Sequence, residues 1–185
     1  LWVSPHSLGK GKSFAVFHFY NGDVIPLVYF SLTDIIFHNS SILGYGSIVH
    51  FDNQFRRNYG GFTINGFTIR NCSFYFAKLV SIRPFADGDG LPIEATLSYY
   101  INNMVVKDCD VNESAIVQHV QQYSTTYVIE IFSVYVTNMT LEANTFVGTG
   151  IVNPFDMIST LLQIVNLSAQ NNSVSVLLEF HKCPI

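Results

Sequence analysis

Charged side chains are scarce in this sequence. Asp, Glu, Lys and Arg make up 12% of the 185 residues, against roughly 25% in ordinary soluble domains. The 9 basic and 13 acidic residues give a formal net charge of −4. The sequence therefore lacks the excess of positive charge with which proteins bind nucleic acids, and we expect no nucleic-acid partner. So few charges beside 49% apolar residues are typical of parallel strands that are largely covered.

Long uninterrupted apolar runs are also missing. A membrane-spanning helix needs about 18 or more consecutive apolar residues. The apolar segment from Tyr127 to Val136 is shorter and contains Glu130. We therefore expect no membrane span in this segment.

The ends of the sequence carry no recognisable leader or cap. The chain opens without a Met or a secretory leader, and it ends on Cys183-Pro184-Ile185. Repeat folds need polar caps to protect their open ends. We interpret residues 1–185 as a single domain with a lead-in at 1–13. We expect it to be a segment of a longer chain or of an assembly whose neighbours cover its ends.

An eight-residue pattern occurs five times without a gap, most clearly as FTIRNCSF from Phe67 to Phe74. Its first and third positions are apolar, which is the alternation of a strand with one buried face. We predict that the copies stack and enclose these side chains. The predicted stacked core is Ile35, Phe67, Met104, Met139 and Leu167 at the first position, and Phe37, Ile69, Val106 and Leu141 at the third.

The five copies begin at residues 35, 67, 104, 139 and 167, so the period is 32, 37, 35 and 28 residues. A variable period around a gapless core is typical of repeat units with loops on one face. Asn or Asp fills the fifth position in four copies, and Asn, Asp or Gly precedes the first position in all five. Both positions suit corners, because these residues tolerate left-handed backbone. With further apolar runs, the pattern predicts an all-β fold, a parallel β-helix: a single-stranded solenoid of about five coils with three short strands per coil. The polar, glycine-rich segment from Phe51 to Gly61 is predicted to be a loop.

The strings INGFTIRNCSF and VTNMTLEANTF resemble the repeats of right-handed parallel β-helix proteins of the pectin-lyase-like group, and of large secreted or cell-surface proteins built from them. The resemblance covers Phe14 to Phe180. It implies a right-handed helix in a secreted or cell-surface protein. It implies no particular activity, because the class includes lyases, hydrolases, adhesins and structural fibres.

The sequence contains no recognisable catalytic or metal-binding set. The strings Asn-Thr-Asp, Gly-His-Gly and Arg-Ile-Lys of hydrolases with this fold are missing, and the six His lie scattered, without a second ligand at metal-binding spacing. Asp87 and Asp89 alternate with Gly, but the other ligands of a calcium loop are absent, so we interpret them as part of a turn. We predict no catalytic residue, no metal and no cofactor other than covalent N-linked glycans.

Cys72 and Cys109 occupy the same position in successive copies. Stacked coils would bring their backbones to about 4.8 Å, which lies inside the range that disulfides use. Neighbouring positions on parallel strands often have unfavourable torsion angles for a disulfide, so two stacked free thiols are the alternative. Cys183 is left over and could pair outside this segment.

Asn-x-Ser/Thr sequons occur six times, whereas 15 Asn and 28 Ser or Thr among 185 residues predict about two by chance. The excess suggests N-glycosylation and therefore secretion. The alternative is an internal ladder of stacked Asn side chains at the corner, formed by Asn39, Asn71 and Asn171. We favour Asn112 as a glycan acceptor, because it lies outside the repeat, followed by Asn138 and Asn166. The six candidate acceptors are Asn112, Asn138, Asn166, Asn39, Asn71 and Asn171.

The fourth position of the repeat is polar throughout and is expected to face water, with Lys107 and Glu142 as neighbours that can pair. The sequence thus predicts an extracellular structural or adhesive glycoprotein, part of a fibre or surface coat that assembles end to end with other coils. The alternative is a carbohydrate-active enzyme or glycan-binding module of the same fold.

Overall fold

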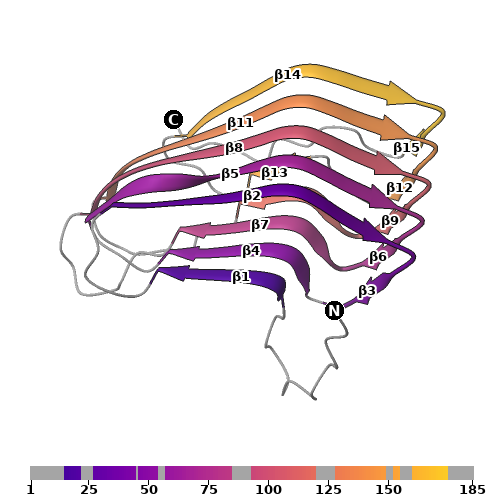
Figure 1. Cartoon of the computed structure of the whole chain (residues 1–185), viewed down its shortest axis with the longest axis horizontal. Coiled ribbons are helices and arrows are strands. Elements are labelled where there is room, and N and C mark those ends of the chain that lie inside the picture. Colours follow the sequence, from indigo (N-terminus) through magenta and orange to yellow (C-terminus); the bar gives the residue numbers. More distant parts are fainter. Residues whose placement is uncertain are drawn as a thin grey trace.

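The fold of this chain consists of parallel β-strands stacked in coils. The computed structural model describes residues 15–21, 27–44, 46–53, 57–84, 93–119, 128–148, 152–154 and 160–174, and all regular structure within them is β-strand. Every strand pairing is parallel. Consecutive strands lie in three different sheets, so that each coil passes through each sheet once. Figure 1 shows successive coils one above another.

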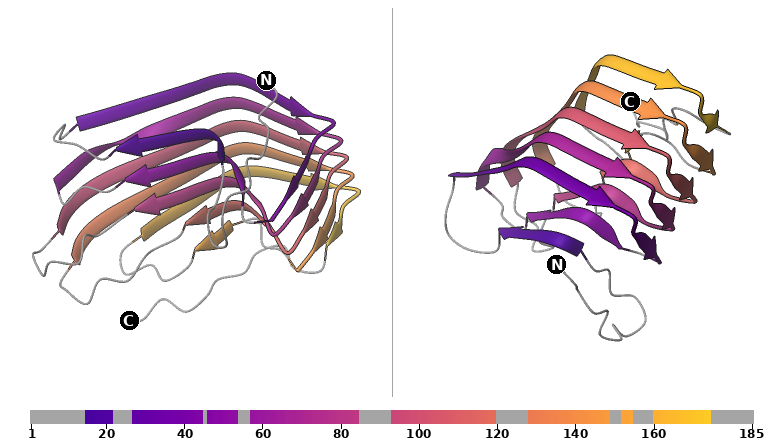
Figure 2. Two further views of the ribbon diagram at one scale, coloured as in Figure 1. Left: turned by 90° about the horizontal axis from the view of Figure 1, so that it is seen from below. Right: turned by 45° about the vertical axis from the view of Figure 1, so that its right-hand side comes forward.

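Each of the three sheets has five strands. Sheet A contains β1 (Ala15–Asn21), β4 (Ser47–Asn53), β7 (Lys78–Pro84), β10 (Ala115–His119) and β13 (Val152–Pro154). Sheet B contains β2 (Leu27–His38), β5 (Arg57–Arg70), β8 (Ile93–Lys107), β11 (Val128–Glu142) and β14 (Thr160–Gln170). Sheet C contains β3 (Ser41–Leu43), β6 (Ser73–Tyr75), β9 (Asp110–Asn112), β12 (Thr145–Val147) and β15 (Ser173–Val174). In Figure 2 sheet B is the widest wall, with sheet A across from it and sheet C closing one side.

The strands pair in the register that the repeat predicts. Ile35 lies opposite Phe67, Phe67 opposite Met104, and Met139 opposite Leu167. Between the third and fourth coils, pairs on both sides of the first position keep the same offset of 35 residues. The eight-residue copies therefore stack directly over one another.

Backbone with positive φ marks both predicted corner positions. The fifth position has φ between 50° and 54° in all five coils, and the residue before the first position has φ between 54° and 74°. Gly66 is the only Gly among these ten, and a Cβ there would lie 2.7 Å from Oδ1 of Asp34 in the coil below. The carboxylate of Asp34 thus fills the space that a side chain at position 66 would need.

The earlier of these corners differs from the prediction of three short strands per coil. Sheet B strands are 11 to 15 residues long and run through the positive-φ residue without ending. Pairing continues on both sides of it, with Thr33 opposite Asn65 and Ile35 opposite Phe67. One left-handed residue turns the strand, but because every coil turns at the same place, the hydrogen-bond ladder is kept.

A third column of positive φ was not predicted. It joins Gly44, Phe76, Glu113 and Gly148, which follow the strands of sheet C. The backbone N–H of Gly44, Phe76 and Glu113 each donates to a carbonyl of the next coil, at 2.8 to 3.1 Å. Gly, Phe and Glu all occur in this column, so no common residue type marked it in the sequence.

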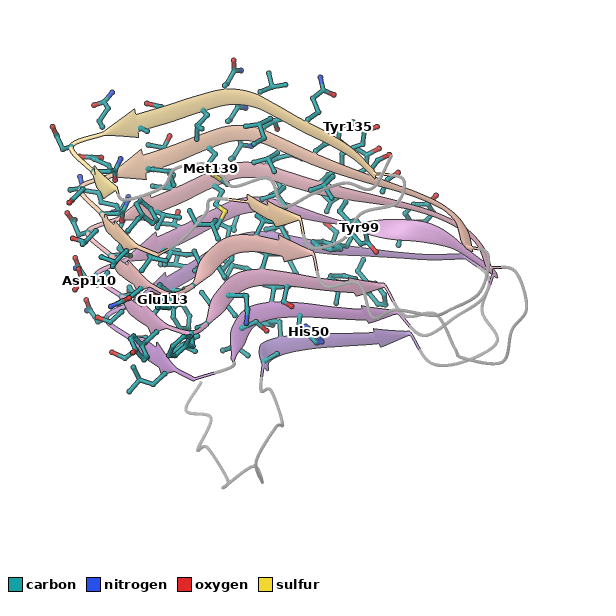
Figure 3. The ribbon with its side chains drawn as sticks, turned by 180° about the vertical axis from the view of Figure 1, so that it is seen from behind. His50, Tyr99, Asp110, Glu113, Tyr135 and Met139 are labelled. Carbon is teal, nitrogen blue, oxygen red and sulfur yellow. The ribbon has the colours of Figure 1, made fainter. Side chains whose placement is uncertain are left out.

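Apolar side chains of all three sheets fill the interior. Phe67, Met104 and Met139 are fully buried, as are Ile69, Val106 and Leu141. Ile35, Phe37 and Leu167 belong to the end coils and are partly buried against this core. Figure 3 shows Tyr99 and Met139 between the sheets, and Asp110 and Glu113 at the outer margin.

The segment predicted as a loop from Phe51 to Gly61 is shorter than expected. Phe51 is a buried residue of β4, and β5 already begins at Arg57. The Phe51 ring stacks on Phe62 of sheet B, with ring centroids 3.6 Å apart. The surrounding polar residues concealed this aromatic contact between two sheets.

Replacing Phe67 by Ala tests the enclosed core. We expect Phe67→Ala to lower the free energy of unfolding by about 3 to 5 kcal/mol, because it leaves a cavity between well-packed coils. Thr68→Ala, at the outward-facing neighbour, should change it by less than about 0.5 kcal/mol. Urea denaturation followed by circular dichroism measures both. Equal effects of the two substitutions would contradict the alternation on which the fold is built.

Candidate functional site

Polar groups concentrate where sheet B turns into sheet C, and we call the fourth to sixth repeat positions in all coils the B–C corner. Backbone hydrogen bonds cross this corner between coils. The N–H of the fifth position donates to the fourth-position carbonyl of the next coil, as from Asn71 to Lys107 at 3.1 Å. The carbonyl of the sixth position accepts from the next coil, as Cys72 does from Asp110 at 2.9 Å. The corner is therefore a continuous part of the ladder.

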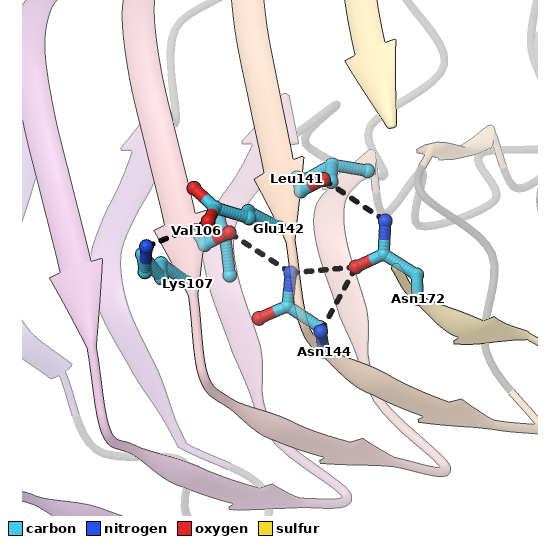
Figure 4. Close-up of polar contacts among 6 residues, drawn as sticks. All are labelled: Val106, Lys107, Leu141, Glu142, Asn144 and Asn172. Carbon is cyan, nitrogen blue, oxygen red and sulfur yellow. Dashed lines mark hydrogen bonds and ion pairs between the residues drawn. The ribbon is translucent and has the colours of Figure 1, made fainter. Parts of the chain in front are cut away.

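The sixth position of the corner points inward and holds a short amide ladder. Asn144 is 2% exposed; its Oδ1 accepts from the backbone N–H of Cys109 at 3.0 Å, and its Nδ2 donates to the carbonyl of Val106 at 2.9 Å. Asn172 does the same one coil further: its Oδ1 accepts from the N–H of Asn144, and its Nδ2 donates to the carbonyl of Leu141, both at 2.9 Å. The two amides are also joined, Nδ2 of Asn144 to Oδ1 of Asn172 at 3.0 Å (Figure 4).

This internal ladder lies one residue away from the one considered in the sequence analysis. Asn39, Asn71 and Asn171 at the fifth position are exposed, and they form no side-chain hydrogen bond with other described residues. Their left-handed backbone turns the chain, and it is the following side chain that enters the interior. A signal was present in the sequence, since Asn144 and Asn172 align with the two cysteines.

Cys72 and Cys109 occupy the inward position in the second and third coils, and both are free thiols that are 2% exposed. Their sulfur atoms approach the carbonyls of Phe37 and Ile69 at 3.8 and 3.9 Å, the equivalents of the carbonyls that the Asn amides bond. Each lies closer to the carbonyl two residues earlier, at 3.1 and 3.2 Å. The thiols thus occupy the positions that Asn side chains fill in the fourth and fifth coils, but their contacts with the carbonyls of the preceding coil are longer and weaker than those of the Asn amides.

The two thiols also perturb each other. A hydrogen bond with Cys109 lowers the pKa of Cys72 to about 7, with burial acting in the opposite direction. The hydrogen bond with Cys72, together with burial, raises the pKa of Cys109. A reactive thiolate also needs access to its target. Because both sulfur atoms are enclosed, this pair is suited to packing rather than to nucleophilic attack.

A second amide ladder runs outside sheet B. Nδ2 of Asn103 donates to Oδ1 of Asn65 at 2.7 Å, Asn138 donates to Asn103, and Asn166 donates to Asn138, the last two at 3.0 Å. Asn138 and Asn166 are sequon residues, and both are exposed. Their amides point along the coils toward the preceding coil, so a glycan there would have to share the amide with this ladder.

Asn112, the acceptor favoured from sequence, is partly buried. The Ser of its sequon, Ser114, is 6% exposed. The Ser114 hydroxyl donates to the carbonyl of Asn112 at 2.6 Å and accepts from the N–H of Ala77 at 2.9 Å. The geometry therefore favours the exposed corner residues Asn39, Asn71 and Asn171 over Asn112.

On the outside of the corner, Nζ of Lys107 lies 2.7 Å from Oε1 of Glu142, as predicted for these neighbours (Figure 4). Both side chains are more than one-third exposed, and such pairs contribute about 0 to 1 kcal/mol. No group of three or more His, Cys, Asp or Glu in the described ranges could hold a metal ion. Asp87, Asp89 and Cys183 lie outside the described residues.

An apolar ridge lies on the outer side of sheet C at the first two coils. Leu43 is 69% exposed, Tyr75 44% and Phe76 37%. The Tyr75 and Phe76 rings meet edge to face with centroids 4.5 Å apart. Phe76 has φ of 55°, a conformation that is rare for aromatic residues. The ridge was not predicted, because the sequence alone does not distinguish these exposed apolar residues from the many apolar residues of the core.

No family model, curated protein or solved structure matches this chain. Within the described residues, no helix is long and apolar enough to cross a membrane.

Asn144→Ala tests the internal amide ladder. We expect the free energy of unfolding to fall by about 2 kcal/mol or more, because the N–H of Cys109 and the carbonyl of Val106 would stay buried without a partner. Thr145→Ala, at the exposed neighbour, should cost less than about 0.5 kcal/mol. Urea denaturation compares the two variants, and an Asn144→Ala protein as stable as the control would show that the amide is dispensable.

The state of the cysteine pair is tested by alkylation. We expect native protein to protect Cys72 and Cys109 from iodoacetamide, because both thiols are enclosed. Protein unfolded in guanidinium without a reductant should become alkylated at both. Peptide mass spectrometry reads each site, and peptides that are modified only after reduction would instead establish a disulfide.

Proposed function

We propose that this chain is part of an extracellular structural or adhesive glycoprotein, secreted or held at the cell surface. Its coils wind as a right-handed parallel β-helix, as in the pectin-lyase-like proteins whose repeats it resembles. Coils from neighbouring molecules add to its ends to build a fibre or coat. The observation that carries the proposal is the unbroken backbone pairing of all three sheets through five coils.

Mechanical stiffness is the property that this arrangement supports. Sheet B pairs each coil with the next through 10 to 13 residue pairs, and the pairing continues through the B–C corner. Inside, Phe67, Met104 and Met139 stack in one buried column. Bending the rod would break hydrogen bonds and side-chain packing together, so the coils resist it as a unit.

Five of the six sequon residues are exposed, which supports a glycosylated surface. The three at the B–C corner, Asn39, Asn71 and Asn171, form no side-chain hydrogen bond with other described residues, which supports their use as sugar acceptors. The apolar ridge of Leu43, Tyr75 and Phe76 supports the adhesive side of the proposal, because exposed apolar clusters rimmed by polar residues are typical of interaction sites.

A glycan-binding module of the same fold is the second candidate. The Tyr100 and Tyr135 rings stand side by side on the outside of sheet B, beside the outer amide ladder. Their centroids are 4.9 Å apart and their planes nearly parallel. Since this separation matches the spacing between strands, the rings turn their faces toward each other and present edges to the outside. A sugar could not stack on the two faces that are in contact, so we rank this function second.

Native material tests the proposed function. Electron microscopy should show filaments or a continuous coat, and isotope-tagged deglycosylation should mark Asn39, Asn71 or Asn171 as Asp in peptide mass spectra. Asn112 is the internal comparison and should stay unmodified or be modified least. Isolated monomers without sugar, or turnover of a pectin-like polymer, would reject the structural role.

A further inference from the structure

We propose that copies of this chain join head to tail in a fixed register, with β14 of one copy pairing in parallel with β2 of the next. Leu167 then lies opposite Ile35, and Asn171 opposite Asn39, as if the second copy supplied the next coil. This inference rests on the proposed function, and it adds the partner, the two surfaces and their alignment.

Within the described residues, nothing protects the C-terminal edge of sheet B against pairing. Natural edge strands are usually blunted by Lys, Pro, bulges or inward charges. β14 is 11 residues long, and its sequence TLLQIVNLSAQ contains no Asp, Glu, Lys, Arg or Pro. On the opposite end, β2 has 12 residues with Asp34 as the only acidic or basic residue besides His38. Two long edges of this kind are suited to accept another strand.

The turns in the strands select which strand can be accepted. Each coil has two left-handed residues five positions apart, at Asp34 and Asn39 in the first coil and at Asn166 and Asn171 in the fifth. A partner that pairs in parallel must turn at the same two places, and the first coil of a second copy does so. An antiparallel partner would place its long sheet B strand beside the short sheet C strand of this copy, so the two chains would not turn at the same places. The spacing therefore specifies the opposite end of another copy.

Hydrogen-bonding groups at the two ends complement each other. At inner joints, the N–H of Ala143 donates to the carbonyl of Gln170 and that of Asn144 to the Oδ1 of Asn172. One coil further, the N–H of Asn172 has no partner among the described residues. Ser40 occupies the matching inward position in the first coil, and its hydroxyl donates to the carbonyl of His38 in its own coil at 2.9 Å. No side chain or backbone group of the described residues donates to this hydroxyl oxygen, so it can accept. The N–H of Asn172 would donate to this Oγ, and that of Asn171 to the carbonyl of His38.

In the part of the chain that the structure describes, the core is less covered at both ends than in the middle coils. Phe67, Met104 and Met139 are fully enclosed, whereas Ile35 and Leu167 in the same column are only partly buried. Ala169 is exposed at the last coil, although its column is buried in the middle coils. Stacking the two ends would place Leu167 against Ile35 and the small Ala169 against the large Phe37. Burial of these apolar groups supplies the driving force for the joint.

Engineered cysteines test the register in the 185-residue chain, made in a host that adds no N-glycans. Cys183→Ser removes the remaining native thiol outside the buried pair. Asn39→Cys and Asn171→Cys proteins are purified separately, mixed and mildly oxidised. The joint stacks these positions about 4.8 Å apart, within the range that a disulfide spans. We expect a disulfide-linked heterodimer in the mixture, and oligomer ladders from a chain with both substitutions. Homodimers of either single variant, or no heterodimer, overturn the joint.

Two matched controls separate the joint from chance collision. Ala143→Cys occupies the same exposed corner column in a middle coil and should cross-link with neither variant. Ala169→Lys, added to Asn171→Cys, places a charge on the inward face of the end coil and should abolish the heterodimer. Ser168→Lys changes the outward-facing neighbour and should keep it. Circular dichroism establishes that each variant is folded.

The cross-linking experiment and the study of native material test the joint and the proposed function independently. Filaments in native material without a cross-link between positions 39 and 171 would keep the structural role and reject this joint. A heterodimer from the purified chain together with monomers in native material would support the joint and reject the fibre.

Discussion

The structure depends on one constraint: every coil must turn at the same residues as the coil below it. A single left-handed residue changes the direction of a strand, and a parallel neighbour keeps its hydrogen bonds only if it turns at the same place. The ten residues of the two predicted corner columns satisfy this in all five coils. Register, inward-facing columns and the B–C corner all follow from it.

Most of the length variation lies where this constraint is relaxed; a single extra residue also separates sheets C and A in the first coil. From the first repeat position to the sheet C strand, each coil has the same number of residues. The connections from sheet A to sheet B span 21–27, 53–57, 84–93, 119–128 and 154–160, and they differ in length. The period can therefore vary from 28 to 37 residues while sheets B and C stay in register. Insertions between sheets A and B therefore leave the strand pairing within sheets B and C unchanged.

The sequence predicted the register, because apolar alternation and the corner residues Asn and Asp recur together. It did not predict that the chain turns at Phe76 and Glu113. Both residues have positive φ, but their side chains have nothing in common that would mark the column in the sequence. The internal ladder was misplaced by one residue for a related reason. Asn39 and Asn144 are the same residue type but differ in position. Asn39 is at the fifth position, where the backbone turns and the side chain points outward. Asn144 is at the sixth position, and its side chain points inward. Residue type alone could not separate these roles. The position of each Asn relative to the turn does separate them.

The interior of the corner explains why the coils tolerate different residues there. Asn144 and Asn172 bond the N–H and carbonyl groups that the turn leaves facing inward, while Cys72 and Cys109 reach the equivalent carbonyls only at 3.8 to 3.9 Å. The thiols compensate by apolar packing, which suits the enclosed second and third coils. The amides lie in the fourth and fifth coils, where they give the backbone groups of the preceding coil hydrogen-bond partners. The sixth position is thus an amide in the fourth and fifth coils, and at the fifth coil the N–H of Asn172 has no partner among the described residues.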